Sequence, residues 1–230
     1  MDYFRKIIVV AALAGAIAGL GMTVAQHVAT VPLILKAEIY EDQGAVGTGP
    51  LQSAAHKHED EGWQPARGFE RTSFSLLANV LTGIGFALLL VGASELFGGI
   101  RDWRQGLFWG FAGFAVFTLA PGLGLPPELP AMPSAELGAR QLWWLATALS
   151  TAIALGLLFY RRSPLASIAA IILLVAPHLI GAPQPASYAT PIPEGLHHSF
   201  VVAVVLTTLL FWLVLGGLAG LFRDRFIATR

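Results

Sequence analysis

The stretch "IIVVAALAGAIAGLGMTVAQHVAT", residues 7–30, decides the fold class of this chain. It contains no Asp, Glu, Lys or Arg, and it exceeds the roughly 20 apolar residues that a helix needs to cross a bilayer. Its apolar run is long for a signal peptide, and "TVAQ" is a poor cleavage site, so we expect a retained membrane helix.

The composition extends this interpretation to the whole chain. Of the 230 residues 55% are hydrophobic and 12% are charged, whereas soluble domains carry about 25% charged residues. Six apolar stretches are long enough to be spans, at residues 7–30, 73–98, 106–125, 141–160, 164–182 and 199–222. The sequence therefore predicts an all-α integral membrane protein of about six transmembrane helices, forming one polytopic domain over residues 1–230. The third and fifth stretches are short and end in prolines, so a count of five stays open.

Several functional classes lack support in the sequence. The net charge is zero, which gives a nucleic-acid partner no electrostatic basis, and the absence of cysteine excludes disulfides and thiolate metal sites. No phosphate-binding G-x-x-x-x-G-K-[ST], no G-x-S-x-G elbow and no H-E-x-x-H is present. We expect a protein that is not an enzyme and holds no permanent cofactor.

The distribution of Lys and Arg predicts the orientation, since cytoplasmic loops carry an excess of both. In an even-numbered topology the larger group falls on one side, namely Arg5, Lys6, Arg101, Arg104, Arg161, Arg162, Arg223, Arg225 and Arg230. The other side holds Lys36, Lys57, Arg67, Arg71 and Arg140, mostly in one long loop at residues 31–72. We therefore expect both termini to be cytoplasmic and the long loop to face outward.

All six histidines fall on the predicted outer half of the protein, together with most of the acids. The outer loop contains "HKHEDE", residues 56–61. In an extended segment His56 and His58 point to the same side, and imidazole with carboxylate suits borderline divalent ions such as cobalt, nickel and zinc. Glu59 and Asp60 would raise the local cation concentration. The alternative is that this stretch is an ordinary solvated loop.

Four further residues are predicted to line the access path for such an ion, and they lie near the outer ends of spans. They are His27, His178, His198 and Glu194. His178 stands in "APHLIGAP", where two prolines interrupt the helix, and such broken backbone survives at membrane depth only against protein or a wet cavity. Polar residues near a helix end also meet headgroups and water, so the alternative for His27 is an interfacial position.

Small residues spaced four apart predict close helix packing. They occur in "GAIAG" (residues 15–19), "GLFWG" (residues 106–110) and "GGLAG" (residues 216–220). A second hypothesis uses the same faces differently, with the protein as a non-transporting assembly or sensor subunit that docks a partner through them.

The chain resembles the CbtA family of predicted cobalt transporter subunits. The most specific stretches are "LAPGLGLPPELP" (residues 119–130) and "RQLWWLATA" (residues 140–148), with "HKHEDEGWQPARGFER" and "APHLIGAP" in support. The resemblance implies a subunit of the bacterial inner membrane that imports Co²⁺ for corrin synthesis. It also implies a small, one-span, histidine-bearing partner of the CbtB type, and it implies five spans rather than six. Ni²⁺ or Zn²⁺ as cargo and a homo-oligomer in the bilayer stay open alternatives.

Overall fold

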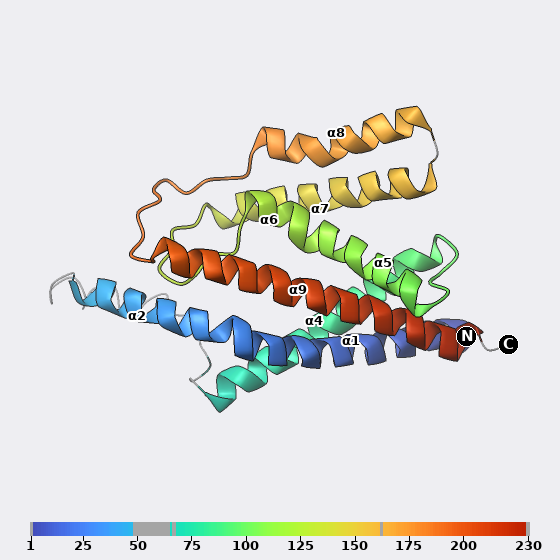
Figure 1. The fold of residues 1–230 in the computed structure, drawn as a ribbon, viewed down its shortest axis with the longest axis horizontal. Coiled ribbons are helices and arrows are strands. Elements are labelled where there is room, and N and C mark those ends of the chain that lie inside the picture. The colour runs from blue at the N-terminus through green and yellow to red at the C-terminus, as the bar shows by residue number, and fades with distance from the viewer. Residues whose placement is uncertain (1, 48–64, 66–67, 162, 229–230) are drawn as a thin grey trace.

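The computed structural model describes residues 2–47, 65, 68–161 and 163–228, and over these residues the secondary structure consists of helices joined by loops (Figure 1). In chain order the helices are α1 (Asp2–Ala29), α2 (Val31–Gly47), α4 (Phe69–Glu95), α5 (Trp103–Phe114), the π-helix η1 (Ala115–Leu119), α6 (Ala120–Gly124), α7 (Leu137–Tyr160), α8 (Pro164–Ile180), α9 (Glu194–Arg223) and the π-helix η2 (Asp224–Ala228). The predicted all-α membrane fold is confirmed.

Five helical segments are long and apolar enough to cross a membrane, by length and composition. They are Tyr3–Ala29, Phe69–Glu95, Trp103–Gly124, Leu137–Tyr160 and Glu194–Ile227. The third combines α5, η1 and α6 into one segment. The chain is thus a multi-pass membrane protein.

The remaining predicted span is α8, which has 17 residues. At about 1.5 Å per residue it is roughly 26 Å long, slightly less than the hydrocarbon core of about 30 Å. It runs antiparallel to α7 along nearly the same length and leads back to the end where α9 begins (Figure 1). With α8 the chain makes six passes of the bundle, and both termini lie at the same end.

Local side-chain contacts explain where several helices begin. The carboxylate of Asp102 accepts from the Gln105 N–H at the start of α5, and the Ser163 hydroxyl accepts from Ala166 N at the start of α8. At α7, Glu136 accepts from the N–H groups of Ala139 and Gly138. These two backbone donors hold the pKa of the Glu136 carboxyl below its usual range.

The prediction of one long loop over residues 31–72 is wrong at both of its ends. Residues Val31–Gly47 form α2, and α4 already begins at Phe69. Pro32 lies in the first turn of α2, where a missing N–H is tolerated. The charged residues of α2 suggested a loop, but its apolar side packs into a second hydrophobic cluster with Leu129, Ile192 and Phe200.

Glycine faces bring two pairs of helices into backbone contact. A Cβ on Gly15 of α1 would lie 2.5 Å from the carbonyl oxygen of Gly83 on α4. At the second crossing, a Cβ on Gly216 of α9 would lie 2.7 Å from the amide nitrogen of Gly110 on α5. The predicted packing role of these small residues is therefore confirmed.

The same contacts correct the second hypothesis about these faces. Gly15 and Gly19 of α1 are covered by α4, and Gly216 and Gly220 of α9 are covered by α5. Because backbone of the same chain already fills these surfaces, they are not open for docking a partner subunit.

Aromatic side chains fill the space between the glycine crossings. Trp212 of α9 is 2% exposed, and its ring centroid lies 4.9 Å from that of Phe86 and 5.6 Å from that of Phe117. Gly113 is needed beside it, because an added Cβ would clash with the indole ring. This cluster joins α4, α5–η1 and α9 in one core.

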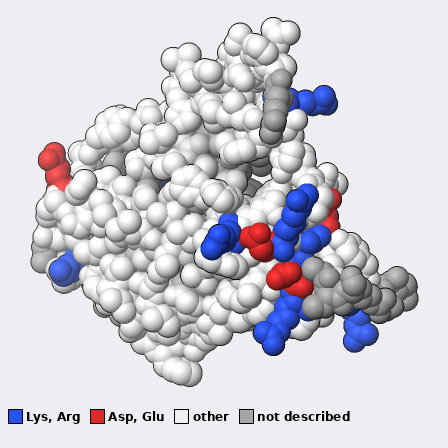
Figure 2. Space-filling model, turned by 45° about the vertical axis from the view of Figure 1, so that its right-hand side comes forward, with Lys and Arg blue, Asp and Glu red and all other residues white. Residues whose placement is uncertain are grey.

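Charged residues gather at the end of the bundle that holds the termini, which we call the basic end (Figure 2). There Arg223 donates from Nε to Glu95 Oε1 at 2.6 Å and from Nη1 to the Ile100 carbonyl at 2.6 Å. Tyr3 Oη also donates to Glu95. This group ties α1, α4 and α9 together at their ends, and Gly99, at φ 75°, leaves room for the guanidinium.

Gly83→Ala is expected to lower the thermal midpoint of the purified protein. The new methyl group meets backbone of α1, and overpacking of this kind costs about 1–3 kcal/mol, more than the helix propensity gained from alanine. The control is Gly85→Ala, where a Cβ has open space, so its midpoint should stay the same or rise. Equal midpoints for the two variants would contradict the close crossing.

Glu95 and Arg223 are expected to be energetically coupled. In a double-mutant cycle with Glu95→Gln and Arg223→Gln, the two losses of unfolding free energy should be non-additive by about 0.5–3 kcal/mol, because either single change leaves the other partner without its ion pair. The measurement is unfolding in mixed micelles. Strictly additive losses would show that the pair does not hold these helix ends together.

Candidate metal-handling site

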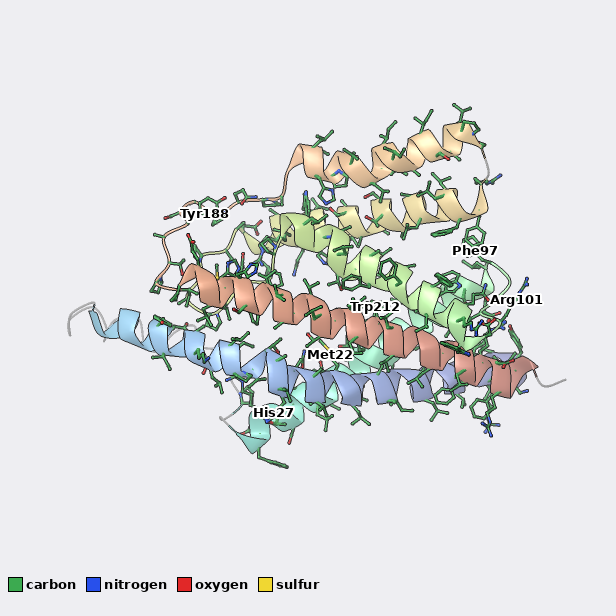
Figure 3. All side chains as sticks on the ribbon, viewed as in Figure 1. Met22, His27, Phe97, Arg101, Tyr188 and Trp212 are labelled. Atoms are coloured by element: carbon green, nitrogen blue, oxygen red, sulfur yellow. The ribbon has the colours of Figure 1, made fainter. Side chains whose placement is uncertain are left out.

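The described histidines lie at the end of the bundle opposite the basic end, which we call the histidine end. His178 is in the last turn of α8 and His27 in the last turn of α1, while His197 and His198 are in the first turns of α9 (Figures 1 and 3). The prediction that these histidines share one side of the protein is consistent with this arrangement. The basic end holds most of the described arginines, among them Arg101, which is labelled in Figure 3.

The predicted capture residues His56, His58, Glu59 and Asp60 lie outside the described residues. The described helices on either side of them are α2, which ends at Gly47, and α4, which begins at Phe69. Both of these helix ends lie at the histidine end of the bundle (Figure 1). Arg71 of α4 and Glu38 of α2 form an ion pair of 2.8 Å there.

The four described candidates occupy separate positions. His27, His198 and Glu194 are exposed, and His178 is half-buried on the far side of the bundle from α1. Among the described residues, no three His, Asp or Glu side chains come close enough to hold a metal ion. An ion would therefore meet these side chains one at a time.

A cluster of polar side chains lies near His27, between α1 and α4. Asn79 of α4 donates from Nδ2 to Gln26 Oε1 at 2.7 Å and lies 3.0 Å from Thr23 Oγ1. Such side-chain bonds between helices stabilise membrane packing. Thr23 and Gln26 thus face α4, whereas His27 is exposed, so these neighbours do not form a site with it.

His178 is the candidate whose two ring nitrogens both have defined contacts with the backbone. Its Nδ1 lies 3.1 Å from the carbonyl oxygen of Leu174 in its own helix, and its Nε2 lies 3.1 Å from the carbonyl oxygen of Ala120 in α6. A neutral imidazole has one N–H, so only one of these contacts is a normal hydrogen bond in that form. Both ring nitrogens lie within hydrogen-bond distance of a carbonyl oxygen, so neither is free of a partner.

Two interrupted helices meet at His178. Pro121 at the start of α6 and Pro177 in α8 have no N–H, so neither continues the normal α-helical hydrogen-bond ladder. Just before Pro121 the ladder widens into η1, where Ala120 N donates to Ala115 O. π-Helical turns inside α-helices are frequent at functional sites. We call Ala120, Pro121, Trp143, Pro177 and His178 the helix-break site.

Trp143 of α7 contacts both Pro177 and His178 at the helix-break site. Its buried indole donates from Nε1 to the Pro177 carbonyl oxygen at 3.2 Å, and its ring lies edge-on to His178 with centroids 5.9 Å apart. Gly124 lies against the same indole, because a Cβ there would clash with it. Trp143 was not among the residues predicted for the site, and the prolines near it in the fold were the available signal that its indole has a carbonyl to bind.

The chemistry available at the helix-break site is one imidazole beside backbone carbonyl oxygens. Imidazole suits cobalt, nickel and zinc, while carbonyl oxygen alone suits harder ions. Among the described residues, His178 is not part of a group of three or more His, Asp or Glu side chains that could hold a metal ion.

Trp143→Phe is expected to lower the unfolding free energy by about 1 kcal/mol more than Trp144→Phe, measured in mixed micelles. Both changes remove a similar apolar surface, but only Trp143→Phe leaves the Pro177 carbonyl without its donor. Trp144 packs on Phe117 without such a hydrogen bond, which makes it the matched control. Equal losses would indicate that the indole only fills space.

Comparison with known proteins identifies the family. The model of the family described as "Probable cobalt transporter subunit (CbtA)" matches residues 4–224, which is nearly the whole chain. No curated protein and no solved structure matches it. The matched residues include the helix-break site, all six histidines and nearly all of each candidate span. The chain therefore belongs to the CbtA family of probable cobalt transporter subunits.

Proposed function

We propose that this protein is the membrane subunit that captures Co²⁺ at the histidine end and passes it through the bilayer toward the basic end. One observation carries the proposal, namely that His27, His178, His197 and His198 all lie at one end of the bundle while the arginines gather at the other (Figures 1 and 2). The family match supports cobalt as the cargo.

Capture begins in this proposal at His56 and His58, with Glu59 and Asp60 supplying negative charge. Two imidazoles separated by one residue can bind a borderline divalent ion together. Nearby carboxylates increase the rate of encounter. His27, His198 and Glu194 are exposed at the same end and extend the attractive surface.

His178 then accepts the ion at the helix-break site. Its Nε2 exchanges the contact with Ala120 O for a bond to the ion, and carbonyl oxygens beside the prolines replace part of the hydration shell. The π-helix permits this exchange, because η1 is where the ladder of the α5–α6 segment is already displaced. The bond is single and therefore weak enough for the ion to leave again.

The setting proposed for this subunit is the bacterial inner membrane, with both termini in the cytoplasm. The clustered arginines of the basic end support this orientation through the positive-inside rule. The word "subunit" in the family description implies a partner protein. We propose that this partner is the small, one-span, histidine-bearing chain and that the assembly transports ions without catalysing a reaction. Ni²⁺ and Zn²⁺ are the competing cargoes, since they accept the same ligands.

The uptake experiment uses cells that express this chain with its small partner and are supplied with radiolabelled Co²⁺. His56→Ala/His58→Ala should reduce the initial uptake rate about tenfold at low Co²⁺ and less at high Co²⁺, because capture matters most when the ion is scarce. Lys57→Ala, between the two histidines, should leave the rate unchanged.

His178→Gln should reduce uptake at every Co²⁺ concentration while leaving the thermal midpoint near that of the wild type, because a glutamine can still donate to Ala120 O. His197→Gln is the control, since His197 contacts the Pro127 carbonyl at 3.1 Å and lies outside the proposed route. Unchanged uptake in both His56→Ala/His58→Ala and His178→Gln would contradict the route and favour the non-transporting assembly or sensor role. Excess Ni²⁺ or Zn²⁺ that abolishes Co²⁺ uptake would reassign the cargo.

A further inference from the structure

A cavity of about 570 Å³ opens between α7 and α9 at the histidine end, and it shares Pro121 with the helix-break site while His178 is not among its lining residues. Its walls come from η1 and α6 on one side, from the start of α7 on another and from α9 on the third. The lining is mostly apolar, with Phe117, Leu137, Trp144 and Val201 as typical members. A volume in this range holds a small organic molecule.

The cavity follows helices that are long and apolar enough to cross a membrane. On α7 its lining runs from Leu137 to Trp144, which at 1.5 Å per residue is about 10 Å. On α9 it includes Val201, Val204 and Val205. Because both helices are candidate membrane spans, an apolar cavity between them is open to the acyl chains of lipids.

An ion pair lies at the wall of the cavity, where it joins the first turn of α7 to the loop that precedes it. Arg140, one of the lining residues, binds Glu128 with 3.0 Å between Nη2 and Oε2. The two side chains are 27% and 26% exposed, so each can still meet an outside group. Among the described residues Arg140 Nε has no hydrogen-bond partner, and a guanidinium has five donors in total.

We propose that the cavity binds one acyl chain of a zwitterionic phospholipid that carries a primary ammonium, such as phosphatidylethanolamine. The phosphate accepts from the guanidinium of Arg140 while the ammonium donates to the carboxylate of Glu128. A neighbouring cation and anion complement such a headgroup, whereas an anionic headgroup with no ammonium is repelled by Glu128. Because the walls are mostly apolar, few polar groups of the protein have to lose water when the acyl chain binds.

Water is a poor occupant of the cavity, because a wall of this kind offers few polar partners. The bound lipid would fill the gap that separates the α7–α8 hairpin from α9.

The test is native mass spectrometry of the full-length protein, purified from bilayers with equal amounts of phosphatidylethanolamine and phosphatidylglycerol. The wild type should retain one phosphatidylethanolamine. Val201→Trp places a large side chain into the cavity and should lose that lipid, whereas Val202→Trp, at a neighbouring exposed position, should keep it. Glu128→Gln removes the partner of the ammonium and should reduce the preference for phosphatidylethanolamine about tenfold, without changing the cavity.

The proposal is overturned if the wild type retains no lipid, if it retains both lipids equally, or if Val201→Trp keeps phosphatidylethanolamine as the wild type does. The thermal midpoint shows whether Val201→Trp is folded. If Val201→Trp is not folded, the test depends on Glu128→Gln. A preference of that variant for phosphatidylethanolamine equal to that of the wild type would refute the proposed headgroup contact.

Discussion

The structure depends on the backbone contact that glycine permits between helices. Where Gly15 meets Gly83, and where Gly110 meets Gly216, each helix approaches until a single methyl group would clash with the backbone of its neighbour. Apolar side chains have little to gain by facing one another instead of lipid, so close packing, rather than hydrophobic burial, has to hold membrane helices together. The two crossings join α1 to α4 and α5 to α9, and the Trp212 cluster and the Glu95–Arg223 pair connect them into one four-helix unit.

The α7–α8 hairpin is attached in a different way. Much of its contact with the four-helix unit passes through η1 and α6, the segment in which the hydrogen-bond ladder widens. There His178 contacts Ala120 O, Trp144 packs on Phe117, and Gly124 lies tight against Trp143. At the other end of α7, the ring of Tyr160 stacks on that of Phe97. The helix-break site and the apolar cavity both lie along this boundary and share Pro121, and we assign ion passage to the side of His178 and lipid binding to the side of Arg140.

The sequence alone predicted the class of fold and most helix positions, because spans of apolar residues need only length and composition to be recognised. It also predicted the function of the small residues, since spacings of four place them on one helix face. It missed α2, because the apolar side that packs near Phe200 is hidden among acids and a proline. It did not find Asn79 as the partner of Gln26, or Trp143 as the donor to Pro177, because both are contacts between distant parts of the chain. His178 was selected as a candidate from the prolines around it, but its contact with the Ala120 carbonyl could be known only from the arrangement of α6 beside α8.

The central claim is that the histidine end faces the side from which the ion is captured, and labelling with a membrane-impermeant maleimide tests it most directly. The chain has no cysteine, so single introduced cysteines report without background. Tyr188, 67% exposed at the histidine end, and Arg101 at the basic end are suitable positions (Figure 3). We predict that Tyr188→Cys is labelled in intact cells and that Arg101→Cys is labelled only after the membrane is opened. The opposite pattern would place the histidines in the cytoplasm and contradict capture from outside.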